Sequence, residues 1–243
     1  RNRNPKKPFT TSTLQQEGAN RLNFRTSKTM SIAQQLYEGV KIQRNQVVGL
    51  ITYMRTDSTR IANSVRNEAI DFIEAEYGNE FVGAKKAPAN AAGAQDAHEA
   101  VRPTSVTRTP ESIKKYLTKD QFRLYQLIWN RFVASQMKSA VYNTMRVDLE
   151  QNGVIFRANG SQLIFPGYQK VYKESSAEKD NILPDLEAGE TVNLLKLDSK
   201  QHFTQPPARY SEATMVKALE ENGVGRPSTY SPTLNTLRKR YYV

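Results

Sequence analysis

The chain has 243 residues, of which 38% are hydrophobic and 24% charged, a composition that can build a folded core and that excludes global disorder. It holds no cysteine and only two histidines, which excludes disulfides, thiolate catalysis, cysteine-ligated zinc and a histidine-rich metal site within it. Its 35 Lys and Arg against 24 Asp and Glu give a net charge of +11, which favours a polyanionic partner, although solubility alone also explains a basic domain.

The first part of the chain predicts two helices behind a short tail. Residues 1–8 are basic and contain proline, and we interpret them as a linker or tail rather than a secretion signal. Ser and Thr at 9–14 are typical helix caps, so a first helix is expected behind them. A second helix is expected from Ser27, followed by a loop over 39–47. No apolar run of ~18 residues occurs, so we expect no membrane span.

The middle of the chain predicts a buried strand and further helices. Residues 48–54 are apolar and rich in β-branched side chains, which indicates a strand that ends at a polar stretch. Asp57 and Ser58 are expected to cap the helix that follows. Residues 83–94 lack a pattern and are expected to form a loop, which the segment 96–103 ends. The expected helices are 61–75, 110–117 and 119–137.

The pattern then changes from helix to strand and back to helix. Apolar and polar side chains alternate over 141–203, which predicts an all-β unit. Asn-Gly pairs are strong signals for hairpin turns. The expected turns are 152–153, 159–160 and 187–190, the last of them before a strand at 192–197. Two helices are expected at 211–222 and about 232–240, on either side of a glycine-bearing turn.

The segment Ile-Thr-Tyr-Met-Arg-Thr-Asp-Ser at 51–58 suits catalysis. In an extended strand Tyr53, Arg55 and Asp57 share one face because side chains alternate. A free tyrosine hydroxyl, with a pKa near ~10, is a weak nucleophile at pH 7, but a nearby guanidinium favours the phenolate and can hold a phosphate oxygen. The pair Tyr53 and Arg55 therefore suits attack on a phosphodiester. A packing tyrosine beside a surface arginine explains the same spacing.

Two more segments suit phosphate binding. His98 and Arg102 follow the expected loop, and each side chain can hold a phosphate oxygen; a hydrogen-bonded loop histidine beside a solvated arginine is the alternative. Arg226, Ser228 and Thr229 follow two glycines and precede a helix, where free N–H groups and the helix dipole favour a phosphate. A glycine that ends one helix before a Ser or Thr that caps the next gives the same pattern.

Five motifs follow one another along most of the chain. They are Pro-Phe-Thr-Thr-Ser-Thr-Leu-Gln-Gln at 8–16, Ala-Gln-Gln-Leu-Tyr-Glu-Gly at 33–39, the segments 49–60 and 96–104, and 206–230 with its Gly-Arg-Pro-Ser-Thr-Tyr ending. In this order and wording the chain resembles bacterial DNA topoisomerase I, a type IA topoisomerase. The resemblance covers only the middle of such an enzyme.

The resemblance implies roles for individual residues. Tyr53 matches the active-site tyrosine, which attacks a single strand and takes up a 5′-phosphotyrosine link. Arg55 matches the arginine that holds the scissile phosphate, and His98 matches a histidine that binds phosphate and assists cleavage. The polar and DNA-contacting positions implied in addition are Gln34, Glu38, Arg102, Arg226, Ser228 and Thr229. For Asp57 we expect a structural or interdomain role.

The implied fold is mixed α and β and multidomain, the core of a type IA topoisomerase. Residues 1–8 are a linker, and 9–137 resemble the mainly helical domain that carries the tyrosine and swings away from the base. Residues 138–205 resemble part of the β-rich arch, or hinge. Residues 206–243 resemble the start of the helical domain that grips single-stranded DNA.

The resemblance implies Mg²⁺ in the parent enzyme, with its ligands outside this chain. The family's acidic (Toprim) domain precedes this region, and the C-terminal zinc-ribbon cysteines are absent as well. We therefore expect a fragment that holds the nucleophile without the metal site and is weak or inactive alone. A smaller departure is Tyr241, which stands where the family usually has a glycine that ends the last helix.

The expected partners are DNA, mainly single-stranded, and the missing acidic domain, in the cytoplasm of a bacterium at its nucleoid. One alternative is a non-catalytic single-stranded DNA-binding module, which describes the fragment better than the parent. A topoisomerase III or reverse gyrase is a second, but the wording at 9–16 and 35–39 favours topoisomerase I. A tyrosine recombinase would need arginines and histidines in an order that does not occur here.

Overall fold

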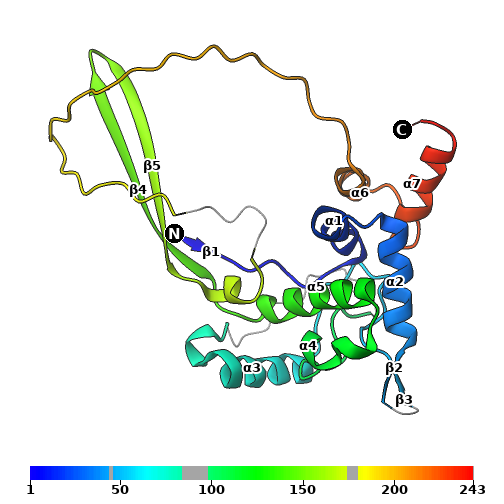
Figure 1. Ribbon diagram of the computed structural model, residues 1–243. Coiled ribbons are helices and arrows are strands. Elements are labelled where there is room, and N and C mark those ends of the chain that lie inside the picture. The colour runs from blue at the N-terminus through cyan, green and yellow to red at the C-terminus, as the bar shows by residue number, and fades with distance from the viewer. Residues whose placement is uncertain (44–45, 84–97, 174–179, 243) are drawn as a thin grey trace.

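Helices and strands combine in a mixed α and β arrangement, as predicted. The structure, a computed structural model, describes residues 1–43, 46–83, 98–173 and 180–242 (Figure 1). The α-helices are α1 (Thr11–Leu22), α2 (Thr26–Glu38), α3 (Asn63–Tyr77), α4 (Pro110–Ile113), α5 (Lys119–Ser135), α6 (Glu212–Glu221) and α7 (Tyr230–Lys239). The strands are β1 (Asn2–Arg3), β2 (Val40–Gln43), β3 (Gln46–Val48), β4 (Ala140–Gln151) and β5 (Val154–Phe165). Short 3-10 helices are η1 (Asn79–Phe81), η2 (Lys114–Tyr116) and η3 (Gly167–Lys170).

Three helices begin at capping boxes formed by local side chains. In α1, α5 and α6 the hydroxyl before the helix accepts from the third helical N–H, and the third side chain accepts from the N–H of the capping residue. The capping residues are Thr10, Thr118 and Ser211. Such a cap contributes about 1 kcal/mol to helix stability, which explains why these starts could be located from the sequence.

Helix α5 supplies a large part of the main hydrophobic core and contacts α1, α2 and α4. Two of its aromatic side chains also make hydrogen bonds. The Tyr125 hydroxyl donates to the Arg108 carbonyl at 2.7 Å, and the Trp129 indole N–H donates to the Val106 carbonyl at 2.9 Å. These bonds fix the segment that leads from the site to α4. Leu14, Leu36 and Ile73 bring α1, α2 and α3 into the same core.

Strands β4 and β5 form a long antiparallel hairpin that projects from the helices (Figure 1). Strand β1 pairs with β4 near its base. The hairpin turns at Asn152 and Gly153, as predicted, and both residues have the positive φ (52° and 79°) that a two-residue hairpin turn requires. At the base, Tyr142 is buried and its hydroxyl donates to Gln169 Oε1 at 2.8 Å. The strand pair is therefore continuous with the helical core at that end.

The chain returns from the hairpin through a long segment without helix or strand. This segment, 182–210, arcs from the hairpin to α6 (Figure 1) and contains the predicted acidic turn at 187–190. Helices α6 and α7 share a small cluster of buried side chains: Val216, Tyr230 and Leu234. Helix α6 packs against α1, and α7 contacts α2. None of the described helices combines the length and apolarity needed to cross a bilayer.

Several sequence expectations about the first half of the chain are wrong in detail. The expected loop at 39–47 contains the short hairpin β2–β3. Of the expected strand at 48–54, Val48 ends β3, and the rest makes only an isolated bridge, between Ile51 and Pro103, because its neighbour is an irregular segment and not a strand. Asp57 and Ser58 do not cap α3, because the helix begins only at Asn63, after Ala62 at its N-cap, while the Arg60 carbonyl accepts from the Ala100 N–H at 2.9 Å.

Two expectations about the β-rich part are also wrong. Asn159 and Gly160 do not form a turn but lie inside β5, where Gly160 is paired with Met145. Residues 192–197 form no strand. The expected loop at 83–94 lies almost wholly outside the described residues, as does Asp96. The boundaries at 8–9, 137–138 and 205–206 stay predictions.

Candidate active site

The segment that carries Tyr53 is neither helix nor strand, bends at Met54, and is held against the start of α1. Thr11 Oγ1 donates to the Met54 carbonyl at 2.6 Å and accepts from the Thr56 N–H at 2.9 Å. Met54 and Thr56 are buried, whereas Tyr53 is half-buried and Arg55 is exposed. The alternation predicted for this segment is therefore present, although a ladder of strand hydrogen bonds is not.

Three aromatic rings lie in a row at this segment. The Tyr53 and His98 ring centroids are 5.3 Å apart with the rings tilted by 47°. Tyr53 also contacts Tyr37, with the two ring centroids 5.4 Å apart in an edge-to-face arrangement. His98 and Tyr37 are exposed. The structure thus brings together Tyr53 and His98, both of which the sequence singled out, and adds Tyr37, which it did not.

The end of α2 supplies Tyr37 and two of the predicted polar residues. Gln34 Nε2 donates to Glu38 Oε1 one turn later, at 2.5 Å, so both lie on one face of the helix. The Leu50 N–H donates to the Leu36 carbonyl at 2.7 Å, which fixes the last turn of α2 beside the approach to Tyr53. Tyr37 could have been found from the sequence, because it stands between these polar residues in the same motif as Glu38.

Arg102 has its guanidinium bound within the chain. It is 8% exposed, pairs through Nε and Nη2 with Glu99 Oε2, and donates from Nη1 to the Pro103 carbonyl at 2.9 Å. A DNA contact by Arg102 stays a prediction, and the hydrogen bonds of its side chain favour an internal role. Glu99 was not selected from the sequence as a site residue, and the three-residue spacing to Arg102 is its only local signal.

The second predicted phosphate site lies at the start of α7. The Arg226 N–H donates to Thr229 Oγ1 at 2.8 Å, and the Thr229 N–H donates to the Arg226 carbonyl at 2.9 Å, which closes a tight turn. Arg226, Ser228 and Thr229 are all exposed. The helix that follows has no side-chain cap. An exposed helix N-terminus with an arginine and two hydroxyls is suited to an anion.

Tyr230 connects the two predicted sites electrostatically. Burial raises the pKa of its hydroxyl, and the carboxylates of Glu220 and Asp57 raise that pKa further, while the Arg226 guanidinium lowers it. Groups from both sites therefore act on one side chain, since Asp57 is two residues from Arg55. The structural or interdomain role expected for Asp57 stays a prediction.

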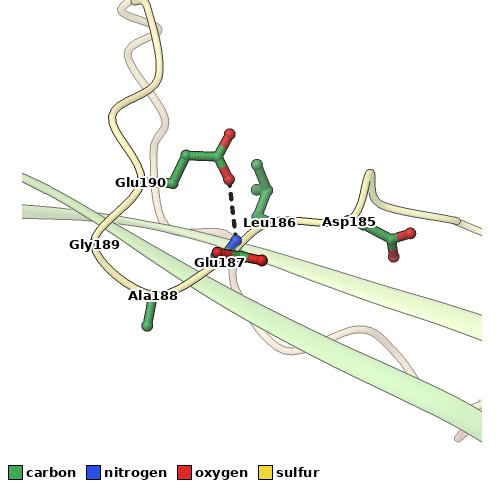
Figure 2. Close-up of a pocket in the computed structure, with 6 residues that line it drawn as sticks. All are labelled: Asp185, Leu186, Glu187, Ala188, Gly189 and Glu190. Atoms are coloured by element: carbon green, nitrogen blue, oxygen red, sulfur yellow. Dashed lines mark hydrogen bonds between the residues drawn. The ribbon is translucent and has the colours of Figure 1, made fainter.

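Acidic side chains gather in another place. Figure 2 shows an open hollow lined by 185–190, in which the Glu187 N–H donates to Glu190 Oε2 at 3.0 Å. All its lining residues belong to one exposed bend, and its three carboxylates disfavour a phosphate, so we assign it no part in the site. Among the residues that the structure describes, no three His, Asp or Glu side chains are placed to hold a metal ion. These residues therefore do not fit a magnesium site.

Comparisons with known proteins agree with the motifs. A family model described as DNA topoisomerase matches residues 1–243. Among solved structures, full-length topoisomerase I from Thermotoga maritima is 42% identical in sequence, with a TM-score of 0.84. That match covers 99% of this chain and 39% of the Thermotoga chain. Since the family model spans the chain from end to end, the chain belongs to the bacterial DNA topoisomerase family, the type IA enzymes.

Proposed function

We propose that the chain is the tyrosine-bearing part of a type IA topoisomerase and that Tyr53 cleaves one DNA strand by transesterification. The phenolic oxygen attacks the phosphorus and loses its proton, the bond from phosphorus to the 3′ oxygen breaks, and that oxygen takes up a proton. The 5′ phosphate stays on Tyr53 as an ester. This ester conserves the free energy of the broken phosphodiester bond. After another strand has passed, the 3′ hydroxyl therefore reseals the strand without a nucleotide cofactor, and negative supercoils are relaxed.

The contact between the Tyr53 and His98 rings carries this proposal. His98 lies beside Tyr53, and Arg55 is exposed two residues further along the same segment, which supports these three residues as the reacting groups. Arg55 is suited to hold the non-bridging oxygens of the scissile phosphate by paired hydrogen bonds. His98 is suited to donate to a phosphate oxygen or to the leaving 3′ oxygen.

We further propose a single strand of DNA as the substrate, with phosphate contacts at the exposed start of α7. Arg226, Ser228 and Thr229 offer phosphate contacts there, while Gln34 and Glu38 lie on one face of α2 and offer further polar contacts. We propose that the chain works with an acidic, magnesium-binding domain of a longer enzyme, on nucleoid DNA in the bacterial cytoplasm.

The test is the covalent adduct, in an enzyme that joins this chain to such a domain. An oligonucleotide labelled at its 3′ end should become attached to the protein and stay attached in detergent, whereas a 5′ label should leave on a shortened strand. Tyr53→Phe should abolish the adduct and largely retain binding. Tyr116→Phe, at an exposed tyrosine outside the site, is the matched control. Adduct formed by Tyr53→Phe would show that another residue is the nucleophile.

A further inference from the structure

We infer that Glu99 is a positioning residue that sets the place of His98 beside Tyr53. This inference rests on the proposed function for its catalytic meaning, but its structural claim stands by itself. Glu99 follows His98 directly, and its carboxylate joins separate parts of the chain. Oε1 accepts from the Ala62 N–H at 2.5 Å, and Oε2 accepts from Arg102 Nε at 3.1 Å and from Arg102 Nη2.

The bond to Ala62 ties Glu99 to the start of α3. Ala62 is the N-cap position of α3, offers no side-chain acceptor, and is followed by no acidic residue in the first turn. The carboxylate of Glu99 supplies a negative group there, which the N-terminal end of a helix dipole favours. The neighbouring backbone bond from the Ala100 N–H to the Arg60 carbonyl, at 2.9 Å, strengthens the same junction.

The bonds to Arg102 continue to the residue next to Tyr53. The Thr52 N–H donates to the Arg102 carbonyl at 2.9 Å, and the Arg102 N–H donates to Thr52 Oγ1 at 3.0 Å. The same hydroxyl donates to the Ala100 carbonyl at 2.7 Å. His98 and Tyr53 each lie one residue from this network. The carboxylate therefore holds residues 98–102 in register with Tyr53, in the way that a supporting shell orients catalytic groups.

A purely structural Glu99 would affect stability without moving the two rings. The chain allows a direct measurement, because it contains only two histidines. In a His202→Gln background, the one histidine left is His98, and the nuclear Overhauser effect between its ring and the Tyr53 ring reports their separation. Glu99→Gln should reduce this effect at least threefold. Glu111→Gln, which removes another ion pair of three-residue spacing, with Lys114, should leave it unchanged.

A second variant protects the test against misfolding. Arg102→Lys keeps the charge but loses the paired bonds, and it should reduce the effect in the same direction. An unchanged ring-to-ring effect in both folded variants would overturn the inference.

The consequence for catalysis is measured separately in the longer enzyme. Glu99→Gln should slow formation of the Tyr53 adduct about tenfold in a single turnover while leaving oligonucleotide affinity unchanged. A wild-type enzyme without adduct would refute the proposed function, and the ring measurement would still decide the role of Glu99. An adduct rate equal to wild type, with the rings displaced, would overturn the claim that this placement matters.

Discussion

The backbone N–H of Thr26 donates to Glu212 Oε2 at 2.7 Å, although the two residues are 186 positions apart. Thr26 is the first residue of α2, which has no side-chain cap of its own, so α6 caps α2 from a distant part of the chain. Glu212 also pairs with Arg238 of α7. At the other end of α6, Glu220 Oε1 accepts from Ser12 Oγ, in the first turn of α1, at 2.5 Å. Two carboxylates of one helix thus dock it on two others.

Replacing Glu212 should loosen this docking. Glu212→Gln removes the charge at the start of α2 and the pair with Arg238, and we expect α6 and α7 to lose about 1 kcal/mol of local stability. Hydrogen exchange of the α6 amides measures the loss. Glu221→Gln, at an exposed carboxylate of the same helix paired with Lys217, should have little effect. Equal protection in both variants would contradict the capping role.

Glu17 should make stability sensitive to acid. Burial raises the pKa of its carboxyl, but the hydrogen bond and charge of Arg21, with Lys6 and Arg131, outweigh burial and lower that pKa overall. The unfolded chain then binds the proton first, so the contribution of Glu17 is complete above the ordinary value of 4.5 and is lost as pH falls through the folded pKa.

The measurement is urea unfolding at pH 7, 5 and 3. Glu17→Gln should lower the free energy of unfolding by about 1 kcal/mol at pH 7 and by less at pH 3. Its carboxylate also accepts from the Tyr172 hydroxyl at 3.2 Å, and burial together with that carboxylate raises the pKa of Tyr172 to about 12. A loss that stays the same at all three pH values would mean that packing, and not charge, explains the effect.

Tyr241 should be replaceable by glycine with a gain in stability. Its φ of 58° lies in the left-handed region just after α7, where a side chain is strained and glycine is not. Tyr241→Gly should stabilise the end of α7 by about 1 kcal/mol, since the exposed ring makes little packing contribution. Amide exchange in α7 tests this, with Tyr242→Gly as the neighbour control. Faster exchange in Tyr241→Gly would contradict the prediction.

Arg226 should contribute to single-strand binding through phosphate contact. Fluorescence anisotropy across a salt series should show tighter binding to a labelled single strand than to a duplex, with affinity that falls as salt rises. Arg226→Ala should weaken binding and reduce the salt slope by about 0.7. Arg146→Ala, at an exposed arginine of the hairpin, is the control for general charge. An unchanged slope in Arg226→Ala would remove Arg226 from the DNA surface.

Local chemistry made much of this fold predictable. The starts of α1, α5 and α6 follow from hydroxyls that cap them within three residues, and the turn at Asn152 follows from its own dihedral preference. The capping of α2 by Glu212 and of α3 by Glu99 could not be predicted, because each acceptor is distant in sequence.

Gly160 shows the same limit in a strand. Like Gly153, it follows an asparagine, but its role is to allow close packing: a Cβ there would lie 2.9 Å from Leu183 Cγ and 3.1 Å from the Asn181 carbonyl oxygen. Whether an Asn-Gly pair forms a turn or lies inside a strand depends on the segments that pack against it, which are distant in sequence. At the site, spacing predicted the face shared by Tyr53 and Arg55, while the contact of Tyr53 with His98 needed the fold or the family resemblance.

The segment 182–210, which has no helix or strand, affects how α6 and α7 can separate from α1 and α2. If the hydrogen bonds of Glu212 and Glu220 break, both helices remain covalently connected to the hairpin and cannot diffuse away. Their effective concentration at the vacated surface is then on the order of millimolar, whatever the concentration of the protein. The docked state can therefore re-form within the same molecule.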